Sequence, residues 1–132
     1  MWNLDDDKFY FKLLDVTIPF AFTWGSDDHQ KRETIRQAVA SRFPSAIPKA
    51  QWWAFRLYAK KGGSHGFDVE NIPKLIVDSF AESQIIRDSS RYLELALYED
   101  DQIDHVRMVQ VSGEASTSGN TTRIEIFGRR IQ

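Results

Sequence analysis

Two short segments in the middle and second half of the chain combine carboxylates with other groups that could do chemistry, and the first of them has the residue types of a metal site. Asp68 and Glu70 are followed by Asn71 and Lys74. In extended backbone, residues two apart project on the same side, so we expect Asp68 and Glu70 to present neighbouring carboxylates. Two such anions repel each other unless a cation lies between them, and Mg²⁺ binds one or two carboxylates together with water. The segment therefore predicts a divalent-metal site.

A helix is predicted directly after this acidic pair, over residues 72–83. Asn71 is a suitable N-cap, Pro73 fits the first turn, and apolar residues follow at helical spacing: Ile72, Leu75, Ile76 and Phe80. Lys74 would lie on the first turn, where its ammonium could face a phosphate held by the same metal. Asp78 comes four residues later and is most simply a surface ion-pair partner of Lys74, so we leave it outside the catalytic set.

The second acidic segment comes just before a predicted strand. It has carboxylates at four positions close together: Glu99, Asp100, Asp101 and Asp104. A solvated turn would tolerate this concentration of charge, and a metal site would use it. Both interpretations fit the segment taken by itself.

Together the two segments resemble the motifs of the RusA-type Holliday junction resolvases. Those enzymes carry an Asp-x-Asp-Asn-x-x-Lys pattern that opens a helix, with an Asp at the end of its apolar stripe. Further on they have an acidic pair followed by x-Gln and a β-branched residue. The matching residues here are Asp68-Val69-Glu70-Asn71-Ile72-Pro73-Lys74, then Asp78, then Glu99-Asp100-Asp101-Gln102-Ile103. The resemblance spans residues 55–111.

The resemblance implies a metal-dependent endonuclease that acts on branched DNA in recombination and repair. Asp68, Glu70 and Asp100 would bind Mg²⁺, or Mn²⁺ in its place, and Asp101 is the alternative third ligand. Lys74 would stabilise charge on the phosphate or the leaving oxygen. The family also implies a homodimer that makes paired nicks in a four-way junction, since a two-fold-symmetric protein suits a two-fold-symmetric substrate.

Several features depart from the family pattern. Glu70 stands where the family has a second Asp, residues 85–97 form an insertion between the motifs, and Ile18-Pro19-Phe20 replaces an N-terminal proline-rich signature. The formal net charge is −2, whereas DNA-binding proteins normally carry an excess of Lys and Arg. These departures favour a second hypothesis, a non-catalytic acidic interaction module with a RusA-like fold.

Composition limits the chemistry further. The chain has no cysteine, which excludes disulfides, thiolate zinc sites, iron–sulfur clusters and a cysteine nucleophile. Three His against 19 Asp and Glu favour hard cations such as Mg²⁺. No apolar run reaches the roughly 18 residues of a membrane span, and the N-terminus lacks the basic and apolar regions of a signal peptide. We therefore expect a cytoplasmic protein without a membrane partner.

Hydrophobic periodicity predicts one α+β domain over residues 1–132, a mixed β-sheet packed by two main helices. Strands are expected where apolar residues alternate, at residues 9–20 (with a bulge or bend), 51–59, 105–111 and 123–127. Helices are expected at residues 29–43, after an N-cap at Asp27 or Asp28, and at residues 72–83. Residues 85–98 fit either a strand or a helix. Residues 60–66, which include His65, and residues 112–122 have the composition of loops.

Overall fold

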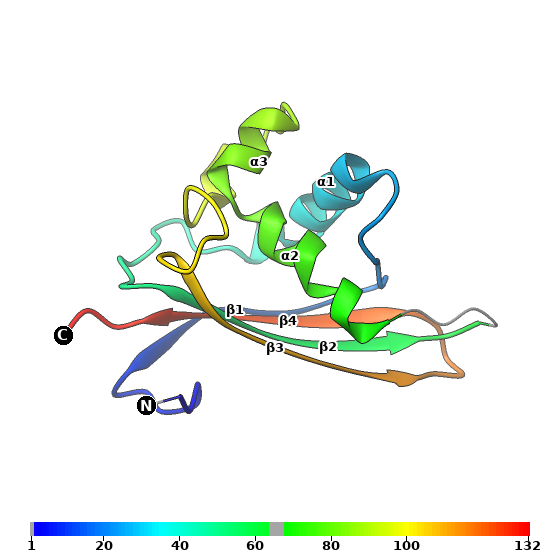
Figure 1. The fold of residues 1–132 in the computed structure, drawn as a ribbon, viewed down its shortest axis with the longest axis horizontal. Helices are drawn as coiled ribbons and strands as arrows, with labels where there is room; N and C mark the ends of the chain where they lie inside the picture. The colour runs from blue at the N-terminus through cyan, green and yellow to red at the C-terminus, as the bar shows by residue number, and fades with distance from the viewer. Residues whose placement is uncertain (1, 64–67) are drawn as a thin grey trace.

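The structure is a computed structural model, and it describes residues 2–63 and 68–132. Four strands form one mixed sheet, and the described helices lie against one of its faces (Figure 1). In the spatial order of the sheet, the strands are β1 (Tyr10–Ile18), β4 (Thr121–Arg129), β2 (Trp53–Lys61) and β3 (Val106–Ala115). β2 and β3 run parallel, while β4 is antiparallel to both β1 and β2. The predicted α+β class with a mixed sheet is confirmed.

The second predicted helix is divided in two. The α-helices of the described residues are α1 (Asp28–Val39), α2 (Pro73–Ser79) and α3 (Glu82–Arg87). Between α2 and α3, the Phe80 carbonyl accepts a hydrogen bond of 2.9 Å from the Leu97 N–H. The Glu82 N–H in turn donates to the Tyr98 carbonyl at 2.8 Å. These tertiary hydrogen bonds replace helical ones, so the chain turns and α3 takes a new direction (Figure 1).

Strands β1 and β2 follow their sequence patterns. The pairing of β1 with β4 shifts between Lys12 and Leu14, which confirms the predicted bulge. In β2, Trp53 and Phe55 belong to the core beneath the helices, whereas Trp52 packs into a smaller cluster on the opposite face. Alternation of apolar residues therefore gave the correct face for Trp52, Trp53 and Phe55.

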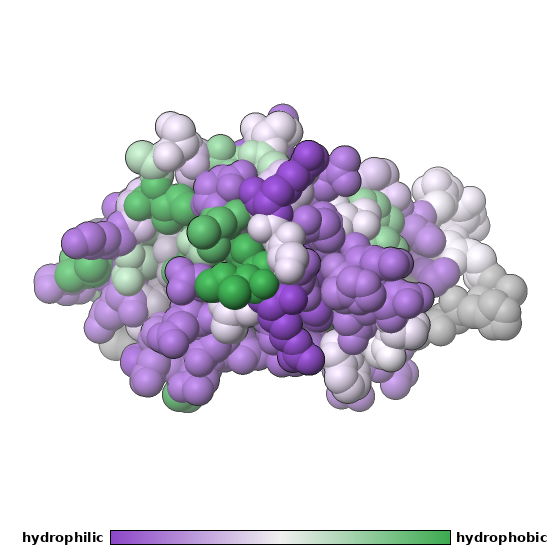
Figure 2. Space-filling model, turned by 90° about the horizontal axis from the view of Figure 1, so that it is seen from above, coloured by the Kyte–Doolittle hydropathy of each residue, from purple (hydrophilic) through white to green (hydrophobic). Residues whose placement is uncertain are grey.

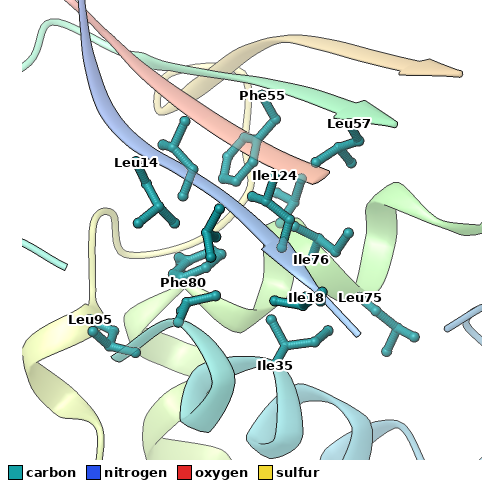
Figure 3. Packing of buried hydrophobic residues seen from close by; sticks show 14 of the residues in the cluster. Leu14, Ile18, Ile35, Phe55, Leu57, Leu75, Ile76, Phe80, Leu95 and Ile124 are labelled. Carbon is teal, nitrogen blue, oxygen red and sulfur yellow. The ribbon is translucent and has the colours of Figure 1, made fainter. Parts of the chain in front are cut away.

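The main core fills the space between the sheet and the helices (Figure 3). The rings of Phe55 on β2 and Phe80 after α2 lie 6.0 Å apart, centroid to centroid. Buried side chains labelled in Figure 3 come from both layers: Leu14, Ile18, Ile35, Phe55, Leu57, Leu75, Ile76, Phe80, Leu95 and Ile124. Burying each of these contributes about 1.5–3 kcal/mol relative to exposure, which holds α2 and its polar side chains firmly on the sheet.

Two predictions about connecting segments are wrong. Residues 112–122 were expected to be a loop, yet β3 continues to Ala115 and β4 begins at Thr121. Lys60 and Lys61, also expected in a loop, extend β2 and pair with the end of β3. Backbone hydrogen bonds require no apolar side chains, and β3 is an edge strand where polar residues are tolerated. Predictions from the alternation of apolar side chains therefore made β2, β3 and β4 too short at this end of the sheet.

Residues 85–98, for which strand and helix were both open, form neither throughout. α3 ends at Arg87, and one turn of 3₁₀ helix, η3 (Leu93–Leu95), follows. Elsewhere, α1 ends in a similar turn, η1 (Ala40–Arg42), before Pro44. In the part of the chain that the structure describes, no helix has the length and apolar character needed to cross a membrane.

A buried charge cluster joins the three α-helices. Arg36 of α1 is fully enclosed, and its Nε donates to the Ser79 carbonyl of α2 at 2.7 Å. Its Nη1 donates to the carboxylate of Asp88, directly after α3, at 3.0 Å. Arg32 binds the same carboxylate through two hydrogen bonds of 2.8 Å. Burial alone would raise the pKa of Asp88, but the hydrogen bonds from both arginines outweigh it and hold the pKa below its ordinary value.

Replacing Asp88 by Asn removes the anion that two enclosed guanidinium groups share. Loss of one partner from a buried ion pair costs about 3–5 kcal/mol, so Asp88→Asn should lower the free energy of unfolding by about that amount. The matched control is Asp15→Asn, which breaks an exposed pair with Arg123 worth at most about 1 kcal/mol. Urea unfolding followed by tryptophan fluorescence measures both variants. Equal losses in the two would contradict the role assigned to the cluster.

Candidate functional site

The first acidic segment has a different backbone from the one predicted. Asp68 is extended, with φ −70° and ψ 129°, but Glu70 belongs to a single 3₁₀ turn, η2 (Val69–Asn71). In a 3₁₀ helix three residues complete one turn, so residues two apart point to different sides. Both carboxylates are exposed. The predicted extended backbone therefore ends at Asp68, and Glu70 lies in the 3₁₀ turn that follows. Residues 64–67, which include His65, lie outside the described residues.

Helix α2 positions Lys74 as the sequence predicted. Pro73 occupies the first turn, although Ile72 rather than Asn71 takes the N-cap position. The Lys74 Nζ lies 3.2 Å from the Asp78 Oδ2, so the predicted ion pair is confirmed. It is not a surface pair, however, because the Asp78 side chain is only 6% exposed. Residue spacing alone did not reveal this burial.

Lys74 also joins the two acidic segments. Its Nζ donates to the Asp101 Oδ2 at 3.0 Å, across 27 positions of sequence. Asp100 instead turns toward its own loop: its Oδ1 accepts from the Gln102 N–H at 3.2 Å and lies 3.8 Å from the His105 Nε2. Asp100 and Asp101 were the two alternatives for the third ligand. Asp101 contacts the first segment through Lys74, whereas the contacts of Asp100 lie within its own loop.

Burial dominates the electrostatics around Asp78. It raises the pKa of the Asp78 carboxyl, and the nearby ammonium of Lys74 only partly offsets this effect. Burial also acts to lower the pKa of Lys74, but the hydrogen bonds and charges of Asp101 and Asp78 outweigh it, so that pKa is raised. Tyr98 is enclosed beside them, with its hydroxyl donating to the Val77 carbonyl at 2.5 Å. Burial raises the pKa of this phenol well above its ordinary value.

The predicted metal ligands are not gathered. Across residues 2–63 and 68–132, no group of three or more His, Cys, Asp or Glu side chains is arranged so that it could hold a metal ion. Asp68, Glu70 and Asp100, all of them described residues, therefore form no such group. In this geometry the three carboxylates do not fit a shared Mg²⁺ or Mn²⁺ ion.

A hollow of about 580 Å³ lies beside the Lys74–Asp78 pair. Its walls include Trp24 before α1, His29 on the first turn of α1, and Arg87 at the end of α3. The helix side of the molecule, on which these elements lie, is mostly polar with a smaller apolar patch (Figure 2). Residue patterns did not point to Trp24, because it lies in a loop where no periodicity singles out a side chain.

The opposite face of the sheet carries a paired network of charges. Glu125 on β4 is enclosed, and its carboxylate accepts hydrogen bonds from Arg56 at 2.8 and 2.9 Å and lies 2.8 Å from the Lys12 Nζ. These contacts, that of Arg56 first, lower the pKa of Glu125. Arg123 binds Asp15 in the same network. Because the cations of this network already face carboxylates, it is a poor surface for binding phosphate.

Comparison with known proteins adds no assignment. No family model matches the chain, and no curated protein matches it. The likeness to RusA-type resolvases therefore depends on the residues of the two acidic segments and their order.

Replacing Asp78 by Asn should change how stability depends on pH. A carboxyl whose folded pKa exceeds its unfolded value of about 3.9 binds protons more tightly in the folded state, so its contribution falls as the pH rises through that interval. The stability of Asp78→Asn relative to the wild type should therefore increase as the pH rises above about 4. Urea unfolding measured from about pH 4 upward gives the difference, with the exposed Asp104→Asn as control. A difference that stays constant with pH would refute the assignment.

Proposed function

We propose that the protein is a metal-dependent endonuclease that cuts branched DNA, as the RusA-type resolvases that it resembles do. One observation carries the proposal: Lys74 of the first motif binds Asp101 of the second at 3.0 Å. Two motifs that are distant in sequence thus share one place on the surface. Carboxylates and a lysine are the groups that phosphodiester cleavage uses to hold a metal and to stabilise charge on phosphate.

The proposed ligands of Mg²⁺ or Mn²⁺ are Asp68, Glu70 and Asp100, with Asp101 as the alternative third ligand. Since these carboxylates are not gathered in the geometry described above, the proposal requires the two segments to close around the ion. The charge of the ion would offset the repulsion among the carboxylates. Lys74 is already anchored between the segments, where its ammonium would face the phosphate.

Cleavage of a synthetic four-way junction tests this proposal. The wild-type protein should nick the junction with Mg²⁺ or Mn²⁺, and Asp68→Asn should reduce the rate at least about 100-fold because a metal ligand is lost. Lys74→Gln should cost a similar factor through lost charge stabilisation. Asp15→Asn, on the opposite face of the sheet, should leave the rate unchanged. Wild-type protein that stays inert with both ions on junction, flap and duplex DNA would defeat the proposal.

A non-catalytic interaction module is the second candidate. It is favoured by the absence of a group of three metal-ligating side chains among residues 2–63 and 68–132, and by the net charge of −2. Calorimetric titration with Mn²⁺ separates the two candidates. Binding by the wild type that is lost in Asp68→Asn supports the nuclease, whereas a wild type that binds no Mn²⁺ supports the module.

We also propose a homodimer, as the resemblance implies, and strand β3 offers a surface for it. Within the described residues, β3 pairs with β2 alone, and Val109 on it is 41% exposed. An exposed edge strand can extend its sheet by pairing with another strand. Val109→Lys places a charge on this edge and should shift the mass measured by light scattering from dimer to monomer. Gln37→Lys on the exposed side of α1 is the control; a dimer in both variants would exclude this edge.

A further inference from the structure

Trp24 exposes an aromatic ring at the hollow beside the candidate site. Its side chain lines the hollow and is 52% exposed, which is unusual for an indole because burial of a large aromatic ring is strongly favourable. Lys74 and Asp78 line the same hollow. An exposed ring that adjoins cationic groups is the arrangement by which proteins hold unpaired nucleotides, with the base stacked on the ring.

The loop that carries Trp24 is fixed at both ends. The Trp24 N–H donates to the Asn71 carbonyl at 3.0 Å, which ties the loop to the first motif. The Lys31 Nζ donates to the Thr23 carbonyl at 2.8 Å, and the Asp28 Oδ1 accepts from the Gly25 N–H at 2.9 Å. A ligand that stacks on this indole therefore orders little additional chain, which reduces the entropic cost of binding.

Cationic groups are available on the other walls of the hollow. Among the residues that the structure describes, the guanidinium of Arg87 has no hydrogen-bond or ion-pair partner. The Lys74 side chain is 49% exposed although it binds two carboxylates. Arg32, in contrast, is committed to Asp88. The hollow thus offers one free and one accessible cation, which suits a single phosphate group rather than a dense polyanion.

We propose that this hollow binds one unpaired nucleotide of single-stranded DNA, with the base stacked on Trp24 and the adjoining phosphate held by Arg87 and Lys74. Its volume of about 580 Å³ falls within the roughly 300–1,000 Å³ of typical small-ligand sites. The carboxylate of Asp28 in its wall offers an acceptor to the amino or imino group of a base. The choice of DNA rests on the proposed nuclease function, and the site would hold a strand that leaves the junction.

Binding of a fluorescent oligothymidylate of about ten nucleotides, in EDTA and followed by anisotropy, tests the proposal without any cleavage. Trp24→Ala should weaken binding about 5- to 150-fold, as expected for the loss of one stacked base, and Trp24→Phe should restore most of the affinity. Arg87→Gln should weaken binding and lower the slope of its salt dependence by about one phosphate contact. The control is Trp2→Ala, because Trp2 is also exposed (57%) but packs on Trp52 at the opposite face of the sheet.

The inference would be overturned by wild-type protein that does not bind the oligonucleotide, by equal affinity in Trp24→Ala and wild type, or by an equal loss in Trp2→Ala. Inorganic polyphosphate that competes as well as the oligonucleotide would also overturn it, since the site would then recognise charge without a base. Failure of the two proposals can be told apart. If the wild-type protein nicks junctions but Trp24→Ala binds the oligonucleotide as tightly as the wild type does, only the nucleotide site is refuted. If binding depends on Trp24 but the protein does not nick any junction, only the nuclease function is refuted.

Discussion

The guanidinium of Arg36 lies without access to solvent at the point where α1, α2 and the end of α3 meet. Enclosing an unpaired charge costs several kcal/mol, so this packing is stable because Asp88 and Glu33 supply the opposite charge and the Ser79 carbonyl accepts a further hydrogen bond. Among the described residues, the Arg36 Nη2 has no partner, and the compensation therefore falls to Nε and Nη1. The helices are held in one relative position, from which the hollow beside Lys74 takes its shape.

The break between α2 and α3 connects this packing to the candidate site. Ala81 forms a parallel bridge with Tyr98, and the backbone of the same segment pairs with Phe80 and Glu82. An unbroken helix would have used these backbone groups internally and left the segment around Tyr98 without them. Because the pairing fixes Tyr98 beside α2, the acidic residues that follow it reach Lys74. The meeting of the two motifs thus depends on a helix that ends early.

Net charge describes this molecule poorly. The net charge of −2 is a sum over the whole chain, and it hides the difference between the open face of the sheet and the helix side. On the open face of the sheet, cations such as Arg56 and Lys12 are matched with the enclosed Glu125, so their charges stabilise the fold and attract little else. On the helix side, Arg87 and Lys74 adjoin a hollow. Local arrangement rather than total charge decides where phosphate is attracted, which is why an acidic chain remains compatible with binding one strand of DNA.

Elements whose patterns are local could be predicted from the residues alone. Alternation predicted β2 and the bulge in β1, helical spacing predicted α1 and the start of α2, and the motif order singled out Lys74. Features that depend on distant partners became visible in the folded chain: the end of α2, the burial of Arg36 and Asp78, and the contact of Lys74 with Asp101. The physical reason is range, because periodicity encodes which face of an element is apolar, whereas the burial of a charge depends on what folds over it.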